Sequence, residues 1–200
     1  CYIGDPVASI DAALAAAPQM TMAHVLKAYL HLLGTEPLGL PVARACHAAA
    51  ADLAATERER GHVEAVRLLT EGRWRAASRV LEDVSIAYPL DALALQAGHS
   101  IDFFRGDSRM LRDRIARALP SWSRSMPGYH ALLGMHAFGL EETADYAQAE
   151  KQGRAAIELE RRDTWAWHAV AHVMEMRNRP ADGIAWMTAD ADAWAEDSFF

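Results

Sequence analysis

Apolar residues recur three and four positions apart along nearly the whole chain, which is the period of an α-helix with one buried face. No segment shows the sustained alternation of apolar and polar residues that indicates a half-buried strand. Prolines and glycines interrupt the helical pattern at short intervals and divide it into about ten helices of roughly ten to eighteen residues. The sequence therefore predicts an all-α fold made of many short helices.

One segment, residues 61–89, has the layout of a tetratricopeptide unit. Its first predicted helix contains the small residue Ala65, its second contains Ala77, and a tight turn at Gly72 separates them. Small residues at these positions let two antiparallel helices approach closely, and a terminal proline ends the unit. The pattern predicts an α-α superhelix, a tetratricopeptide-like solenoid of antiparallel helix pairs.

The chain is expected to contain two regions. Residues 1–60 form helix pairs without a clear repeat consensus, and residues 61–200 form tetratricopeptide-like repeats. The sequence starts without an initiator Met and stops inside a predicted helix, so we expect the last repeat to be truncated at its C-terminal end. The expected repeats span about 61–89, 90–120, 127–161 and 163–200, and the small residues expected to be buried at their helix contacts are Ala65, Ala77, Ala137, Ala149 and Ala171.

Three stretches carry a resemblance to a known family: DALALQAGHSIDFFRGDSRMLRDRIARALPSW, GMHAFGLEETADYAQAE and TWAWHAVAHVMEM. In these stretches the sequence resembles the tetratricopeptide repeat protein 38 family, over about residues 5–200 and most densely from Gly61 onward. The resemblance implies a superhelix of tetratricopeptide-like units. It implies no established biochemical activity, and in that family the chain continues into a further helical half.

Charge and cysteine content exclude several classes of function. A net charge of -7 gives no overall attraction to phosphate backbones, so we do not expect nucleic acid to bind. No apolar stretch reaches the ~18 residues of a membrane span, so we do not expect a membrane partner. The two cysteines, Cys1 and Cys46, cannot form a disulfide framework, which favours a reducing compartment and predicts a cytoplasmic protein.

Candidate chemistry is concentrated in residues 164–176. His168, His172 and Glu175 lie four and three residues apart, so a helix places them within roughly 60° of one face. Aligned as a tetratricopeptide unit, this face lines the concave groove of the repeat. First helices of adjacent units pack about 8–10 Å apart, so residues from earlier units can reach the same groove. These residues are Phe138, Glu141 and Glu142 in the preceding unit and His99 in an earlier one.

Three interpretations of this cluster remain open. His168, His172 and Glu175 could hold a divalent metal, with Glu141 or Glu142 as a fourth ligand or general base in a hydrolytic or oxidative enzyme. The face could instead be a groove for a peptide, a protein partner or a small-molecule ligand. It could also be a structural polar seam, in which each histidine bonds a neighbouring carboxylate or carbonyl. The leading functional prediction is a binding module, with the metal-dependent enzyme as its alternative.

The remaining polar and aromatic residues have structural interpretations. The run RMLRDRIAR, residues 109–117, is interpreted as a solvated outer face of a helix. His130 and His136 lie six residues apart, on different helix faces, which favours packing roles. Four tryptophans near the C-terminal end, Trp165, Trp167, Trp186 and Trp194, are expected to pack between repeats and not to form a cofactor site.

Overall fold

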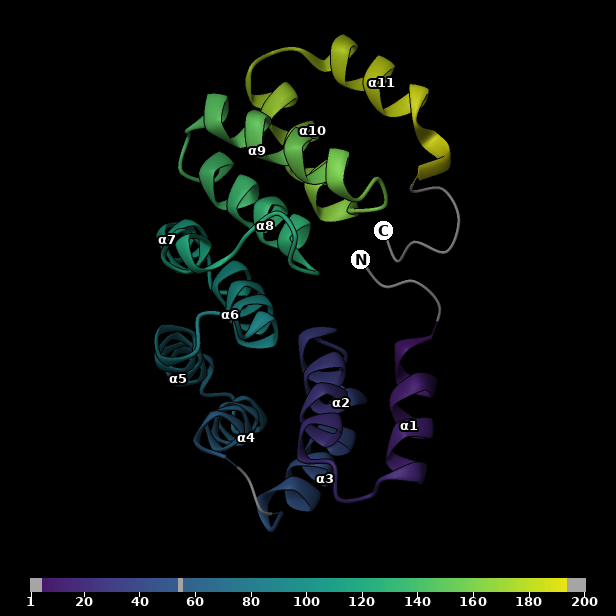
Figure 1. The fold of residues 1–200 in the computed structure, drawn as a ribbon, viewed down its shortest axis with the longest axis vertical. Helices are drawn as coiled ribbons and strands as arrows, with labels where there is room; N and C mark the ends of the chain where they lie inside the picture. Colours follow the sequence, from purple (N-terminus) through teal and green to yellow (C-terminus); the bar gives the residue numbers. More distant parts are fainter. Residues whose placement is uncertain (1–4, 54–55, 194–200) are drawn as a thin grey trace. The chain divides into compact units, whose positions relative to one another are not determined.

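The structure, a computed structural model, describes residues 5–53 and 56–193, and within these residues every regular element is a helix (Figure 1). This confirms the predicted all-α fold of antiparallel helix pairs. Two 3-10 turns, η1 and η2, follow α7 and α11. Trp194, one of the four tryptophans expected to pack between repeats, lies outside the described residues. The helices are α1 (Pro6–Ala16), α2 (Thr21–Leu33), α3 (Gly39–Ala51), α4 (Glu57–Thr70), α5 (Trp74–Ala87), α6 (Ala92–Phe104), α7 (Ser108–Ala118), α8 (Tyr129–Glu141), α9 (Tyr146–Leu159), α10 (Thr164–Met176) and α11 (Pro180–Ala189).

The helices divide between two compact units. The N-terminal unit, residues 5–105, contains α1 to α6, and the C-terminal unit begins at Gly106 and contains α7 to α11. Within each unit, consecutive helices pack together, as α4 with α5 and α8 with α9. The first helices of successive pairs also pack together, as α2 with α4 and α8 with α10. A first helix thus contacts both the next helix along the chain and the one after it, as in a stack of helical hairpins.

The same kind of turn recurs along the chain. Its marker is a residue in the left-handed region: Gly72 (φ 73°), Gly106 (φ 65°), Ala144 (φ 65°) and Asn178 (φ 55°). After three of them, Gly72, Ala144 and Asn178, the next residue donates its N–H to the carbonyl five positions earlier, at 2.8–2.9 Å, which satisfies a carbonyl at the helix end. The four markers are separated by 34, 38 and 34 residues. The first and last intervals equal the tetratricopeptide period.

Small residues lie at the helix contacts, as the repeat pattern predicts. Ala65, Ala77, Ala137 and Ala149 are all fully buried, at 0% exposed. Ala171 is only half-buried, so that part of the prediction is wrong. Here α11 approaches α10 beside Met174 instead, whose Sδ would lie 3.4 Å from a Cβ added at Gly183.

Helix α8 is the most enclosed helix of the C-terminal unit. Ten consecutive residues, Leu132 to Glu141, are buried, because α7, α9 and α10 all pack against this helix. Its closest neighbour is α7: a Cβ added at Gly139 would lie 2.6 Å from the Arg112 Cα. The end of α8 that carries Glu141 is therefore held on several sides.

A histidine connects successive helix pairs in both units. In the N-terminal unit, His62 Nε2 of α4 donates to the Asp91 carboxylate at 3.0 Å, and Asp91 caps α6 by accepting from the Ala94 N–H at 3.0 Å. In the C-terminal unit, His130 of α8 bonds Asp163 at 2.8 Å, and Asp163 caps α10. Each of these histidines thus links a first helix to the cap of the next first helix.

Candidate functional site

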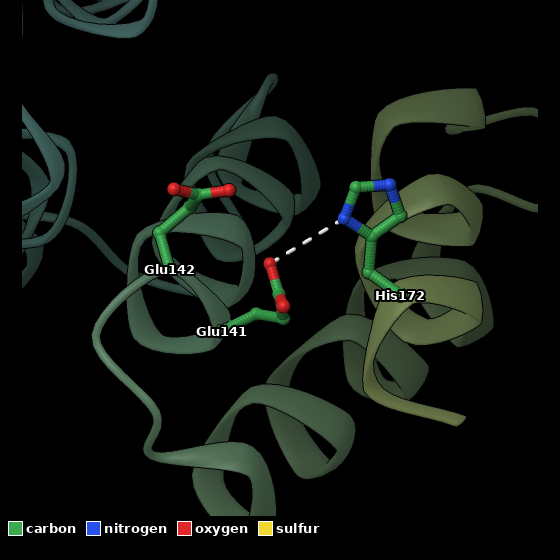
Figure 2. A group of neighbouring side chains, drawn as sticks. All are labelled: Glu141, Glu142 and His172. Carbon is green, nitrogen blue, oxygen red and sulfur yellow. Dashed lines mark ion pairs between the residues drawn. The ribbon is translucent and has the colours of Figure 1, made fainter. Parts of the chain in front are cut away.

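Three side chains near the α8–α10 contact form what we call the acid–histidine cluster: Glu141, Glu142 and His172. One oxygen or nitrogen from each lies within 4.8 Å of the others. Figure 2 shows the Glu141 carboxylate between Glu142 and the His172 ring. The His172 Nδ1 lies 3.5 Å from the Glu141 Oε2. Among the described residues, this is the group of histidine and acidic side chains that meets a metal-ligand spacing.

The repeat explains why these residues meet. Glu141 lies three residues before the left-handed Ala144, and Glu175 lies three residues before the left-handed Asn178. Phe138 and His172 share the position six residues before these markers. Because α8 and α10 are the first helices of successive pairs and pack together, equivalent positions on them lie side by side.

Glu141 is a buried charge at a repeat position whose other occupants are apolar or exposed: Leu69 in α4 is buried, whereas Phe103 in α6 and Glu175 in α10 are exposed. The equivalent residue in α4 is Leu69, three residues before Gly72, and it is 2% exposed. Glu141 is only 6% exposed, and its buried Oε2 accepts no hydrogen bond from any described residue. A carboxylate in this environment loses hydration without full compensation. The fold therefore carries a destabilising charge at this position.

Burial also changes the protonation of the cluster. It raises the pKa of Glu141, and the neighbouring carboxylates of Glu142 and Glu175 raise it further, while His172 opposes the shift. Burial and the neighbouring His172 lower the pKa of His168. The site therefore favours added positive charge near Glu141 and a neutral ring at His168.

A row of aromatic rings runs along α10 to the cluster. Trp165 stacks on His168 at 5.3 Å between centroids and 12° between planes, and the His168 and His172 rings lie 4.3 Å apart. Phe138 of α8 lies beneath them, 4.7 Å from Trp165 and 6.0 Å from His172, and is 1% exposed. His168 is exposed, whereas Trp165 and His172 are half-buried. The row presents ring edges and faces to solvent beside the acidic side chains.

The structure brings together only some of the seven site residues predicted from sequence. His172, Glu141 and Glu142 come together within ligand distance, and His168 joins them only through its ring contact with His172. Glu175 is exposed at the next turn of α10 and acts on Glu141 through its charge.

His99 belongs to the N-terminal unit and is 3% exposed. It lies seven residues before Gly106, the position that Ala65 and Ala137 occupy before their own left-handed residues. That position is fully buried at a helix contact in α4 and α8, whereas Ala171, which holds it in α10, is half-buried. Its predicted place in a groove stays a prediction.

The chemistry available at the cluster is that of a cation-binding site. Two carboxylates and one imidazole provide oxygen and nitrogen donors of the kinds that bind divalent metals or accept hydrogen bonds from basic groups. No described helix combines the length and apolar character needed to cross a membrane. A comparison of the chain with known protein families finds no family model that matches it.

Proposed function

We propose that this chain is a helical-repeat binding module whose α8–α10 face binds a positively charged ligand. This face comprises the acid–histidine cluster and the aromatic row of Trp165 and His168. The observation that carries the proposal is the Glu141 carboxylate, which is 6% exposed, whereas the buried equivalent in α4 is Leu69 and the equivalent glutamate in α10, Glu175, is exposed. Such a departure from the packing pattern is typical of a functional position.

The sign of the ligand follows from the charges around Glu141. Glu142 and Glu175 both act on its carboxylate, and burial makes its negative charge costly until a cation approaches. The half-buried Trp165 ring of the aromatic row also suits a cation, because the face of an aromatic ring carries negative partial charge. The same positive charge is carried by a metal ion and by a Lys or Arg side chain of a peptide. An acidic ligand is disfavoured.

The proposal predicts that Glu141→Leu stabilises the protein by about 1–3 kcal/mol, because it replaces a buried carboxylate with the side chain that α4 uses at this position. Urea unfolding of the two proteins at pH 7 measures the difference. Glu175→Leu is the matched control, since this exposed glutamate holds the equivalent position in α10 and its replacement should change stability by less than about 0.5 kcal/mol. A loss of stability in Glu141→Leu would instead identify Glu141 as a structural partner of His172.

Ligand charge is tested with arrays of Lys- and Arg-containing peptides, alongside the same sequences with Glu replacing each basic residue. Binding of basic peptides, weakened by Glu142→Gln and by raised salt, supports a peptide partner on this face. Asp83→Asn, at an exposed position of α5 in the other unit, controls for the loss of one negative charge. If neither basic peptides nor metal ions bind the wild-type protein, the proposed function is wrong.

Three further proposals concern family, enzymatic activity and location. Membership of the tetratricopeptide repeat protein 38 family is supported by the three matching stretches and by the two 34-residue intervals between turns. A metal-dependent enzyme is the second candidate function, and it requires first that the cluster binds a metal. A cytoplasmic location is proposed from the cysteine content alone.

A further inference from the structure

We infer that the acid–histidine cluster is a binding site for a divalent transition-metal ion, with Glu141, Glu142 and His172 as its protein ligands. The inference rests on the proposed function and names the class of cation that the face binds. It assigns a ligand set that differs from the one expected from helical spacing within α10, namely His168, His172 and Glu175.

The first argument is distance. Two ligands bound at about 2.0–2.2 Å to a tetrahedral metal lie roughly 3.3–3.6 Å apart. The His172 Nδ1 and the Glu141 Oε2 are separated by 3.5 Å, a distance at which no hydrogen bond joins them. The third donor, Glu142, lies within 4.8 Å of both and is exposed, so a rotation of its side chain can close the remaining gap.

The second argument is the burial of the Glu141 Oε2 atom. A ligand that contacts this atom must enter between α8 and α10. A bare metal ion can do so once the half-buried His172 ring rotates, whereas an ammonium or guanidinium on a peptide brings its own chain and several hydrogen-bond donors. A small ion therefore fits this atom better than a basic side chain does.

The third argument is donor chemistry. A metal ion binds carboxylates in their ionised form and imidazole in its neutral form, so these three ligands would bring two negative charges, which match a divalent ion. An imidazole nitrogen suits zinc, manganese or iron(II), whereas magnesium and calcium prefer oxygen donors alone. Three protein ligands would leave coordination positions for water or a partner's oxygen atom. The ion would offset the charge that burial makes unfavourable at Glu141.

His168 and Glu175 are placed beside the metal ligands and not among them. The His168 ring stacks nearly parallel on Trp165, at 12°, and touches His172 through its ring. Glu175 lies exposed at the next turn of α10. These two residues therefore provide matched controls, one histidine and one glutamate on the same helix.

The test is calorimetric titration of untagged, chelator-treated protein with Zn²⁺ and with Mn²⁺, accompanied by the absorption spectrum of the Co²⁺ complex. His172→Ala and Glu142→Gln should each weaken binding by at least about tenfold, because removal of a ligand costs no less than removal of its supporting residues. His168→Ala and Glu175→Gln should bind as the wild type does, apart from a small electrostatic effect. Glu141→Leu, which is expected to fold stably, should also lose the metal.

Three results would overturn the assignment. Absence of Zn²⁺ and Mn²⁺ binding to the wild-type protein would exclude the metal site. If His168→Ala or Glu175→Gln weakened metal binding as much as His172→Ala does, the ligand set would be the one expected from helical spacing. A Co²⁺ spectrum unchanged by His172→Ala would place the metal elsewhere. A protein that binds basic peptides through Glu142 but binds no metal would contradict this inference. The same result would still support the proposed function.

Discussion

Gly139→Ala is expected to destabilise the protein by about 3 kcal/mol, at the upper end of the cost of overpacking a core. A Cβ at this position would lie 2.6 Å from the Arg112 Cα and 2.6 Å from the Leu111 carbonyl carbon, distances that no rotamer change can relieve because both atoms belong to the α7 backbone. The two helices must therefore separate. Denaturant unfolding followed by circular dichroism measures the loss.

Gly183→Ala is the control for this substitution. Both glycines lie within helices of the C-terminal unit, but a Cβ at Gly183 would meet only the flexible Met174 side chain, at 3.4 and 3.5 Å. Alanine should stabilise α11 there by up to about 1 kcal/mol through its higher helix propensity. If Gly139→Ala were as stable as the wild type, the close crossing of α7 and α8 would be wrong. Glu141 lies two residues from Gly139, so separation of the helices should also weaken ligand binding.

The fold could be predicted from sequence because its determinants are local. Helical period and the glycines at 72 and 106 are visible in the sequence, and both glycines have the left-handed backbone expected of a helix end. The equivalent turns at Ala144 and Asn178 carry no glycine. These two turns are 34 residues apart, but Ala144 follows Gly106 by 38 residues, so the repeat period does not locate them from the glycine turns, and alanine gives no local signal for this conformation.

In the arginine run, charge alone gave a wrong prediction of which side chains are exposed. Interpretation of residues 109–117 as a solvated face is wrong for Arg114, which is 1% exposed. Arg114 falls on the same stripe of α7 as Leu111 and Ala118, three and four residues away, and both of these are buried. The apolar period thus outweighs the charge in setting which side of α7 faces the core.

The candidate site was predictable only in part, for a geometric reason. Spacing within α10 places His168, His172 and Glu175 on one face, but it contains no information on which residues of α8 lie opposite. The α8–α10 packing brings Glu141 and Glu142 to His172. A signal was present in the repeat alignment, since Glu141 stands where Leu69 stands in the earlier unit. A charged residue where another repeat has a buried leucine is a better marker of the site than histidine spacing.

The histidine connections between helix pairs give a second large expected effect, because the two instances differ in burial. His62 is 0% exposed and bonds Tyr29 Oη at 3.1 Å as well as Asp91 at 3.0 Å. The His130 side chain is 31% exposed where it bonds Asp163. If the histidine is removed, water can therefore hydrogen-bond to Asp163 more easily than to Asp91.

His62→Ala should therefore cost about 3–5 kcal/mol, because it leaves a buried carboxylate and a buried hydroxyl short of partners and opens a cavity. His130→Ala, the matched control, should cost only about 1 kcal/mol. Urea unfolding at pH 7 measures both. Equal losses would show that burial does not set the strength of these connections.

Acid provides the second measurement on the same variants. Burial raises the pKa of Asp91, but the His62 hydrogen bond, the Ala94 N–H and the Arg58 charge outweigh it, so the pKa lies below its usual value. A lowered carboxyl pKa stabilises the fold fully above the unfolded value of about 3.9, and this contribution is lost as pH falls through the folded pKa. The difference in the free energy of unfolding between wild type and His62→Ala should therefore become smaller below about pH 4. A difference that stays constant across that range would mean that His62 acts through packing alone and not through the Asp91 carboxylate.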